Sequence, residues 1–486
     1  MASMVGNNAI GWAQFQLNGG WKNTLGVLIG YAVVIGGLII VMASIDPRQA
    51  SSVYSGWTKG LLGLQLAILV LYGSNRIIGG IRRDFTGQMI ESHRLMPVPS
   101  LHAIAGYIFG GASQALSLAL VNFILGAVTT RGAGLPTGYW LKANFVMVTF
   151  AVFVWTVVAF AALSARGAMF WVVGPVVVFW MSGGALSLLL PGVSVLATPL
   201  QGPSVFDARL VNRAPELYGA PIGCQALIAG ICVIAAMRKY RRSDDAAFSP
   251  LLALSMLAAV ALTSAIGVRW FDGMAPEFLH DEGDLDVQLV SSTIALMLFV
   301  TAAMCSVAWS EALARRAALR REPLPPRERR VLPPLLGVVL ATGIGAAMIY
   351  AGAWHWTGDE ATAFRRYGVG VLLVHALSIA YLARWIYSRI DRAIVIIVIW
   401  MALIWLGPLV IDLIIRSFEE RQRDIGTIAA WSPIGCLIAL VDPDDANPRI
   451  GLLGQFAVAL LPVLLYYTDQ MRTTRILKRT AAAAEG

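Results

Sequence analysis

Charged residues are scarce in this sequence. Only 13% of its 486 residues are Asp, Glu, Lys or Arg, whereas about 25% is usual for a soluble globular domain. Apolar residues make up 57%, and the mean hydropathy is +0.70. The net charge is +9, but the basic residues lie between long apolar runs. This composition excludes an ordinary soluble enzyme, a disordered chain and a nucleic-acid-binding module.

Paired cysteines and catalytic motifs are also missing. A GxxxxGK[ST] phosphate loop is absent, so this chain does not hydrolyse ATP by that route. We find no HExxH, CxxCH, GxSxG or paired-carboxylate pattern, and we expect no catalytic residue, no metal site and no cofactor. His375 is the only histidine well inside an apolar run, and we expect it to bond to a neighbouring helix. The cysteines are widely spaced and are expected to be small apolar fillers: Cys224, Cys232, Cys305 and Cys436.

Long apolar runs are what the sequence does contain. A membrane helix needs about 20 mostly apolar residues, and twelve windows qualify. They lie near 24–43, 58–79, 101–128, 141–164, 168–191, 218–237, 249–268, 287–310, 333–354, 368–387, 393–415 and 449–467. The sequence therefore predicts an all-α integral membrane protein with about twelve transmembrane helices.

The distribution of basic residues predicts the orientation, because Lys and Arg concentrate in cytoplasmic loops. With both termini in the cytoplasm, 24 Lys and Arg lie inside and 13 outside, which accounts for all 37. Acidic residues show the opposite bias, with 10 inside and 18 outside. The loop 272–286 alone holds six acidic residues and no basic one. We expect a plasma (inner) membrane protein with both termini in the cytoplasm.

The spacing of the windows indicates an internal duplication. The first six begin about 228 residues before the last six, with nearly constant offsets, and the long loops match as well. In each half a Pro-containing segment, Ala197–Leu200 or Trp431–Ile434, precedes a stretch too short to cross a bilayer, which we expect to form a short helix covered by protein. We predict two parallel six-helix repeats, residues 1–244 and 245–486. Chance similarity is the alternative, because identity between the halves is slight.

One loop resembles a known family. Residues 80–106 read GIRRDFTGQMIESHRLMPVPSLHAIAG and follow the second window. They resemble the signature of type-2 ATP-binding-cassette (ABC) exporter permeases, which have a Thr-Gly or Gly-Thr pair, an acidic residue and a Leu-x-x-Pro-Val run. Leu95 stands two residues before the proline instead of three, so the match is loose. The matching residues are Arg83, Thr86, Gly87, Glu91, Leu95, Pro97, Val98, Ser100 and Gly106.

The resemblance implies a short coupling helix in this loop that lies on a cytoplasmic ABC ATPase subunit. It also implies the six-helix unit, an interfacial helix at 7–22, and alternating opening of a cleft between the halves. The residues agree, because Pro97 and Pro99 stop any helix before the next span. Glu91 is suited to pair with an Arg of the ATPase. A solvated inner loop without a partner is the alternative interpretation.

The matching loop of the second half departs from the pattern. It reads SEALARRAALRREPLPPRERRVLPP and has no Gly-Thr pair and no Leu-Pro-Val run. Three interpretations remain open: a plain topology signal, a degenerate coupling element, and a site for anionic lipid head groups. The candidate residues are Arg315, Arg316, Arg320 and Arg321.

Ionisable residues are rare within the predicted spans. Arg76, Lys142 and Asp412 lie near span ends, where we expect them to snorkel to the surface. This scarcity favours a permease subunit of an ATP-driven exporter with an apolar or amphipathic cargo. Its expected partners are cytoplasmic ABC ATPase subunits and membrane lipids, with no nucleic acid. The alternatives are an ion-coupled secondary transporter and a non-transporting scaffold subunit.

Overall fold

The computed structural model describes residues 8–45, 47–164, 214–241, 247–272, 283–320, 333–352, 359–389, 393–416, 428–440 and 448–485. These residues are helical apart from short turns and linkers, and they include no strand. The chain divides into two compact units, Met1–Ala247 (unit 1) and Phe248–Gly486 (unit 2). That the units are equivalent repeats stays a prediction.

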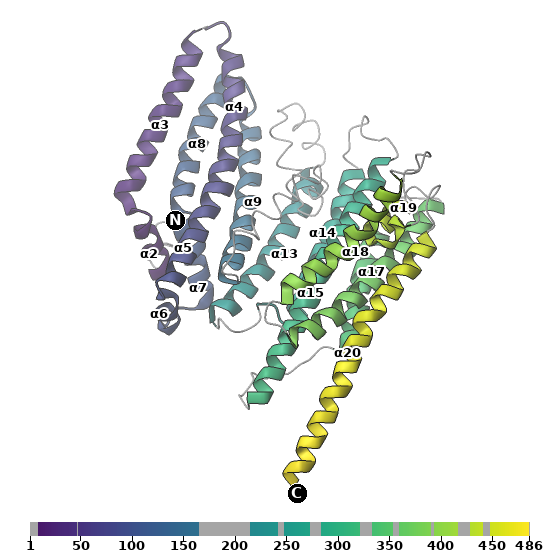
Figure 1. The fold of residues 1–486 in the computed structure, drawn as a ribbon. Helices are drawn as coiled ribbons and strands as arrows, with labels where there is room; N and C mark the ends of the chain where they lie inside the picture. Colours follow the sequence, from purple (N-terminus) through teal and green to yellow (C-terminus); the bar gives the residue numbers. More distant parts are fainter. Residues whose placement is uncertain are drawn as a thin grey trace. The chain divides into compact units, whose positions relative to one another are not determined.

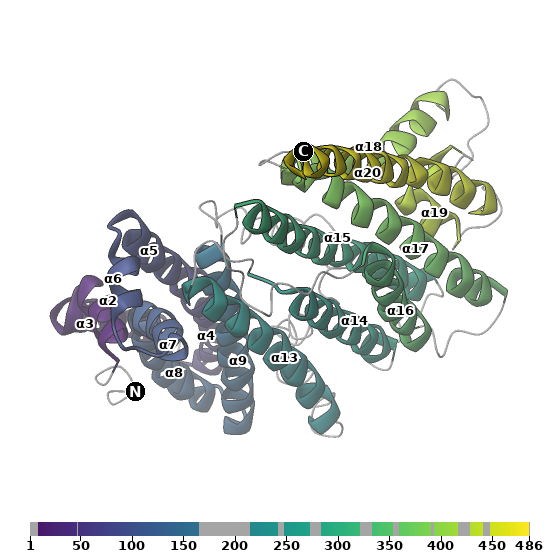
Figure 2. The same cartoon turned by 90° about the horizontal axis from the view of Figure 1, so that it is seen from below.

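Unit 1 is a bundle of long helices with a group of short helices at one end (Figure 1). α8 lies against α3, α4 and α9 (Figure 2), and α13 packs on α9. In chain order the elements are α2 (Ala9–Leu17), α3 (Gly20–Ile45), α4 (Ala50–Leu66), η1 (Ala67–Tyr72), α5 (Gly73–Thr86), α6 (Met89–Leu95), α7 (Ser100–Ala105), η2 (Gly106–Gly110), α8 (Ser113–Gly132), α9 (Thr137–Ser164) and α13 (Ala214–Arg241).

Helix α4 continues through η1 into α5, so one helix runs from Ala50 to Thr86. η1 is a π-helical segment, whose wider turn leaves backbone carbonyls without their usual intrahelical partners. The indole Nε1 of Trp155 donates to the Leu69 carbonyl at 2.8 Å. Gly73 allows this contact, because a Cβ there would lie 2.7 Å from the same indole ring. The π segment thus locks α9 against the middle of the helix.

Unit 2 is arranged around α17 (Asp359–Tyr387), which packs against α15, α16, α18 and α20 (Figure 2). One hydrophobic core includes residues of all these helices. The remaining elements are α14 (Pro250–Asp272), α15 (Gly283–Arg320), α16 (Pro334–Gly352), α18 (Ala393–Arg416), η5 (Ala429–Trp431), α19 (Pro433–Ala439) and α20 (Pro448–Glu485).

The short helix expected around Trp431–Ile434 is present as η5 and α19. Ser432 caps α19, since its hydroxyl oxygen accepts from the Ile434 and Gly435 amides and also donates to the Trp405 carbonyl at 2.6 Å. α17, α18 and α20 pack around α19, so protein covers the irregular backbone as a membrane requires. The corresponding segment Ala197–Leu200 lies outside the described residues.

The protein is an all-α integral membrane protein. Among the described residues, ten helical segments are long and apolar enough to cross a membrane. The window 168–191 lies outside the described residues, and the described apolar part of α14, Pro250–Ile266, is shorter than a span. A total of twelve therefore stays a prediction. The ten segments are Gly20–Ile45, Ala50–Thr86, Ser113–Gly132, Thr137–Ser164, Ile222–Arg241, Ser292–Trp309, Pro334–Gly352, Thr362–Tyr387, Val395–Ile415 and Pro448–Met471.

Candidate functional site

The candidate coupling segment lies at one end of unit 1, together with the C-terminal turns of α5 and α13 (Figure 1). We call this the α6 end. The opposite end holds the α3–α4 and α8–α9 turns, where Ser51 donates to the Ala133 carbonyl and Gly132 lies against the Tyr54 ring. The two ends are separated by the length of the membrane-spanning helices.

The structure places each residue of the predicted coupling loop. Arg83 and Thr86 lie in the last turn of α5, which corrects the expectation that this stretch is a loop. Gly87 ends that helix, and Gln88 follows with a left-handed φ of 56°. A sharp turn thus separates α5 from α6, which carries Glu91 and Leu95. Pro97 lies in the four-residue linker 96–99 that precedes α7.

Helix α6 has one buried and one exposed face. Ile90 and His93 are buried, whereas the Leu95 side chain is 89% exposed. Met89 and Glu91 are exposed too. An apolar residue exposed beside a carboxylate on a short helix is a suitable contact surface for another protein.

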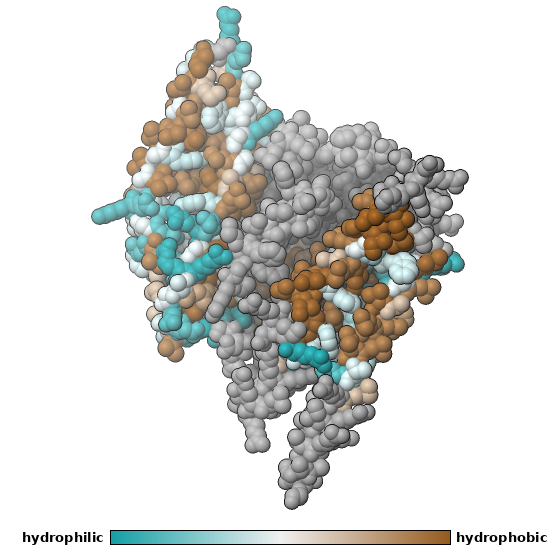
Figure 3. Space-filling view, in the orientation of Figure 1, coloured by the Kyte–Doolittle hydropathy of each residue, from teal (hydrophilic) through white to brown (hydrophobic). Residues whose placement is uncertain are grey.

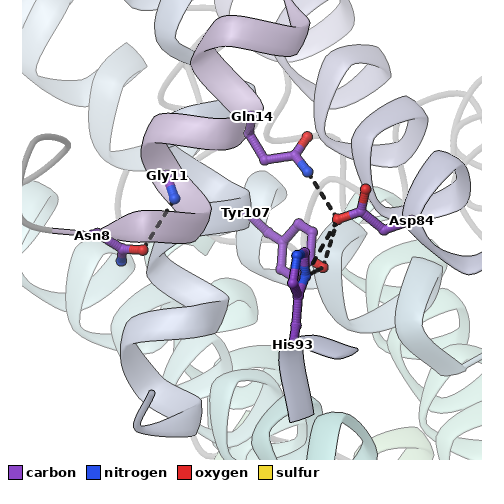
Figure 4. A network of polar contacts seen from close by, with 6 residues as sticks. All are labelled: Asn8, Gly11, Gln14, Asp84, His93 and Tyr107. Carbon is purple, nitrogen blue, oxygen red and sulfur yellow. Dashed lines mark hydrogen bonds and ion pairs between the residues drawn. The ribbon is translucent and has the colours of Figure 1, made fainter. Parts of the chain in front are cut away.

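Behind α6 lies a buried polar network centred on Asp84, which is fully buried in α5 (Figure 4). Its Oδ2 accepts from Gln14 Nε2 of α2 at 2.9 Å and from the Tyr107 hydroxyl of η2 at 2.7 Å. His93 Nδ1 of α6 lies 3.1 Å from the Tyr107 hydroxyl and 3.7 Å from Asp84 Oδ2. One carboxylate therefore joins α2, α5, α6 and η2.

The direction of the bonds in this network follows from the acceptor. The Tyr107 hydroxyl donates its only proton to Asp84 Oδ2, so its oxygen is left to accept from His93 Nδ1–H. Asp84 Oδ1 has no hydrogen-bond partner. The sequence did not single out Asp84, because a charged residue near the end of an apolar run is usually solvated. The feature of the sequence that points to it is Gln14, a polar residue between the apolar residues of the predicted interfacial helix.

A second connection ties α6 to α13. Arg94 forms an ion pair with Glu91, and its Nε donates to the Tyr240 carbonyl at 2.6 Å. Its Nη2 also donates to the Lys239 carbonyl at 3.3 Å. These carbonyls belong to the last turn of α13, where a cation is favoured by the helix dipole. Glu91, which was expected to await an Arg of a partner, thus already has an Arg within its own helix.

The expected interfacial helix at 7–22 is α2 followed by the first turn of α3. Asn8 caps α2 by accepting from the Gly11 amide at 3.0 Å. The helix packs closely on η2, because a Cβ on Gly110 would lie 2.5 Å from the Gly11 carbonyl oxygen. α2 is therefore built into the α6 end.

The second candidate loop begins inside a helix. α15 runs to Arg320, so Arg315, Arg316 and Arg320 lie in its last turns, whereas Arg321 is outside the described residues. Two turns earlier, Glu311 accepts from Arg384 Nε of α17 at 2.8 Å in a buried ion pair. Arg384 is 4% exposed, so this pair joins α15 and α17 inside unit 2.

The three residues expected to snorkel differ in their surroundings. Arg76 donates to the Tyr72 hydroxyl and to Gln114 Oε1 at about 2.9 Å, so its head group is bonded within unit 1. Asp412 is only 3% exposed in a helix whose other side chains are largely exposed. Lys142 is exposed, as expected.

The expectations for His375 and the cysteines are confirmed. His375 Nε2 lies 2.9 Å from Thr301 Oγ1 and 3.1 Å from the Met297 carbonyl, both on α15. All four cysteines are free and buried. Burial raises the pKa of the Cys436 thiol to about 12. Within the described part of the chain, no group of three or more His, Cys, Asp or Glu is placed to hold a metal ion.

No protein-family model, curated protein or solved structure matches this chain. The function must therefore be argued from the α6 end itself.

Proposed function

We propose that this chain is the membrane-spanning permease subunit of an ATP-driven ABC exporter, with ATP hydrolysis on separate ATPase subunits. The proposal rests on the exposure and the contacts of α6. It is a short helix that presents Met89, Glu91 and Leu95 outward and is hydrogen-bonded from behind to η2 and α13. The chain is then a plasma-membrane protein with the α6 end in the cytoplasm, and its cargo is apolar or amphipathic.

The bonds of α6 explain how a push on this helix reaches the membrane. Arg94 connects it to α13, and Ser100, at the start of α7, accepts from Arg241 Nε of α13 at 3.2 Å. His93 connects it through Tyr107 to Asp84 on α5. A force applied to α6 is therefore shared by the helices that continue into the bilayer, because each of these contacts joins two helical elements.

Co-purification with an ABC ATPase tests the proposal. Co-expressed ABC ATPase subunits from the same genome are expected to bind the detergent-solubilised chain and to hydrolyse ATP faster when bound. The variant Thr86→Ala/Glu91→Ala and the variant Leu95→Asp should each weaken association about tenfold, a usual cost of losing central interface contacts. Leu95 is 89% exposed, so its replacement leaves the fold intact.

The matched control is Arg131→Ala, an exposed charge at the opposite end of unit 1. It should bind the ATPase normally. If all variants bind and stimulate the ATPase as well as the parent, or if no ABC ATPase associates with the parent, the proposed function is wrong.

A further inference from the structure

The outer surface of α2 carries large exposed apolar side chains. Its buried face includes the polar residues Gln14 and Asn18, which are 2% and 8% exposed. Its exposed face carries Trp12, Leu17 and, just after the helix, Trp21, which are 44%, 46% and 59% exposed. Ile10 and Phe15 are buried as well, and Gln16 is exposed, so the outward face of α2 combines large apolar side chains with one amide. Indole rings at such a position are typical of the membrane interface.

The exposed apolar residues form one ordered surface. The Phe15 ring lies 5.9 Å from the Trp12 ring and 5.1 Å from the Trp21 ring, edge-on to the latter. Phe15 itself is buried, so it holds both indoles in place. Directly after this surface, α3 continues as the least buried of the spans, with 6% of its central window covered by protein. α2 thus lies where the hydrophobic surface of α3 gives way to the hydrophilic α6 end (Figure 3).

Exposed cations stand at the C-terminal end of α2. Lys22 is exposed in the first turn of α3, and Arg83 is exposed on α5 with its Nη1 3.5 Å from the Leu17 carbonyl. Residues 8–45 and 47–83 contain no Asp or Glu. The first carboxylate of the described chain is Asp84, which is fully buried. Lys22 and Arg83 therefore have no exposed carboxylate from their own segments to pair with.

We propose that this surface, formed by Trp12, Leu17, Trp21, Lys22 and Arg83, binds an anionic phospholipid of the leaflet at the α6 end. The indoles lie at the boundary between the head groups and the acyl chains. The two cations contact the lipid phosphate. A zwitterionic phospholipid has the same phosphate but a compensating ammonium, so net charge is what the surface selects.

Occupancy of this surface is transmitted to α6. The face of α2 opposite the lipid carries Gln14, which donates to Asp84, and Asp84 also holds Tyr107 and His93 of α6. A lipid that moves α2 toward the bilayer therefore pulls, through Gln14, on the carboxylate that positions α6. This inference adds regulation to the proposed function, but its binding step needs no ATPase and is tested without one.

The test uses a bimane fluorophore on Leu95→Cys in detergent micelles. The four native cysteines are buried, so the label is confined to α6, and the unmodified parent reports any background. The sample is titrated with dioctanoyl phosphatidylglycerol or with dioctanoyl phosphatidylcholine. Only phosphatidylglycerol should shift the emission. Lys22→Gln/Arg83→Gln should raise the midpoint concentration about 25-fold, at about fivefold for each cation removed.

Two control variants test whether binding is specific to this surface, and a third variant tests transmission to α6. Lys59→Gln and Arg131→Gln remove exposed cations away from this surface and should leave the midpoint unchanged. Gln14→Met keeps the side-chain length but removes the donor to Asp84. It should retain bound phosphatidylglycerol, counted by native mass spectrometry, while the bimane shift disappears.

The lipid site is refuted by an equal response to phosphatidylcholine, by an unchanged midpoint in Lys22→Gln/Arg83→Gln, or by an equal shift in the control variants. A bimane shift that survives in Gln14→Met refutes the transmission through Asp84. Because no ATPase is present, neither result depends on whether the exporter proposal holds.

Discussion

Asp84 is the residue on which the α6 end depends most. A fully buried carboxylate is costly unless it is hydrogen-bonded, and here two donors from α2 and η2 converge on one of its oxygens. The same hydrogen bonds stabilise their donors, because Gln14 and Tyr107 are buried and need an acceptor. Asp84 therefore stabilises the packing of α2 as much as α2 stabilises Asp84.

Replacing Asp84 by Ala should lower the free energy of unfolding by about 2 kcal/mol or more, because it leaves two buried donors unpaired. Asp84→Asn should cost less, because the amide oxygen still accepts one of the bonds. Thermal unfolding in detergent, followed by fluorescence, measures both. Ser92→Ala, at an exposed site on α6, serves as the control and should stay within about 0.5 kcal/mol of the parent. Equal stability of Asp84→Ala and the parent would contradict a structural role for the network.

At this scale the sequence predicted some residues and not others. His375 could be assigned to a neighbouring helix because an isolated polar group in an apolar run needs a partner. Asp412 was assigned to the surface from its distance to a span end, but its side chain is buried. Distance along a helix does not reveal which side of it faces protein.

At the scale of elements, the contact between α2 and η2 is made by backbone. A Cβ at Gly110 would lie 2.5 Å from the Gly11 carbonyl oxygen, and one at Gly106 would lie 2.8 Å from the Gly11 amide nitrogen. Only glycine leaves room for this approach. α2 is held at a fixed distance that brings Gln14 to Asp84.

Gly110→Ala should therefore displace α2. Hydrogen exchange of the α2 amides, followed by mass spectrometry, is expected to become about tenfold faster or more, while exchange in α9 stays unchanged. Gly79→Ala is the matched control, because a Cβ there meets no atom within 4 Å, and alanine favours the helix. Unaltered protection of α2 in Gly110→Ala would show that the close approach is not needed.

The sequence predicted which elements occur at the α6 end better than it predicted where they begin and end. Pro97, Pro99 and the polar run before them indicate a short helix ahead of the next span, and α6 is found there. The extension of α5 to Thr86 was missed. Polar residues such as Arg82, Arg83 and Asp84 are typical of a loop when read alone. The burial of Asp84 depends on its partners in α2 and η2, which lie far from it in sequence.

At the scale of the whole molecule, the apolar windows predicted a multi-span helical protein, and this is confirmed. Hydropathy succeeds here because a membrane leaves few alternatives to apolar helices. The equivalence of the two halves and the orientation stay predictions. Both depend on features other than apolar content: the matching of loops in one case and the distribution of Lys and Arg in the other.

Thiol labelling tests the orientation. Ser92→Cys at the α6 end should react with a membrane-impermeant maleimide only from the cytoplasmic side, and Ser52→Cys at the opposite end only from outside. Both serines are exposed. The native thiols give little background because they are buried, and Cys436, with its pKa raised to about 12, holds almost no thiolate at pH 7. Reaction of Ser92→Cys in intact cells would reverse the predicted topology.

The π-helical segment η1 sets the helical phase of everything that follows it in α5. Each residue of an α-helix advances the side chains by about 100°, and a wide turn holds one residue more than an α-helical turn. Asp84 lies 14 residues, or about 21 Å, beyond the middle of η1. Without the extra residue, Asp84 would be turned by about 100° from its present position opposite Gln14 and Tyr107. The alignment of the buried network therefore depends on a single wide turn that lies about four turns earlier in the same helix.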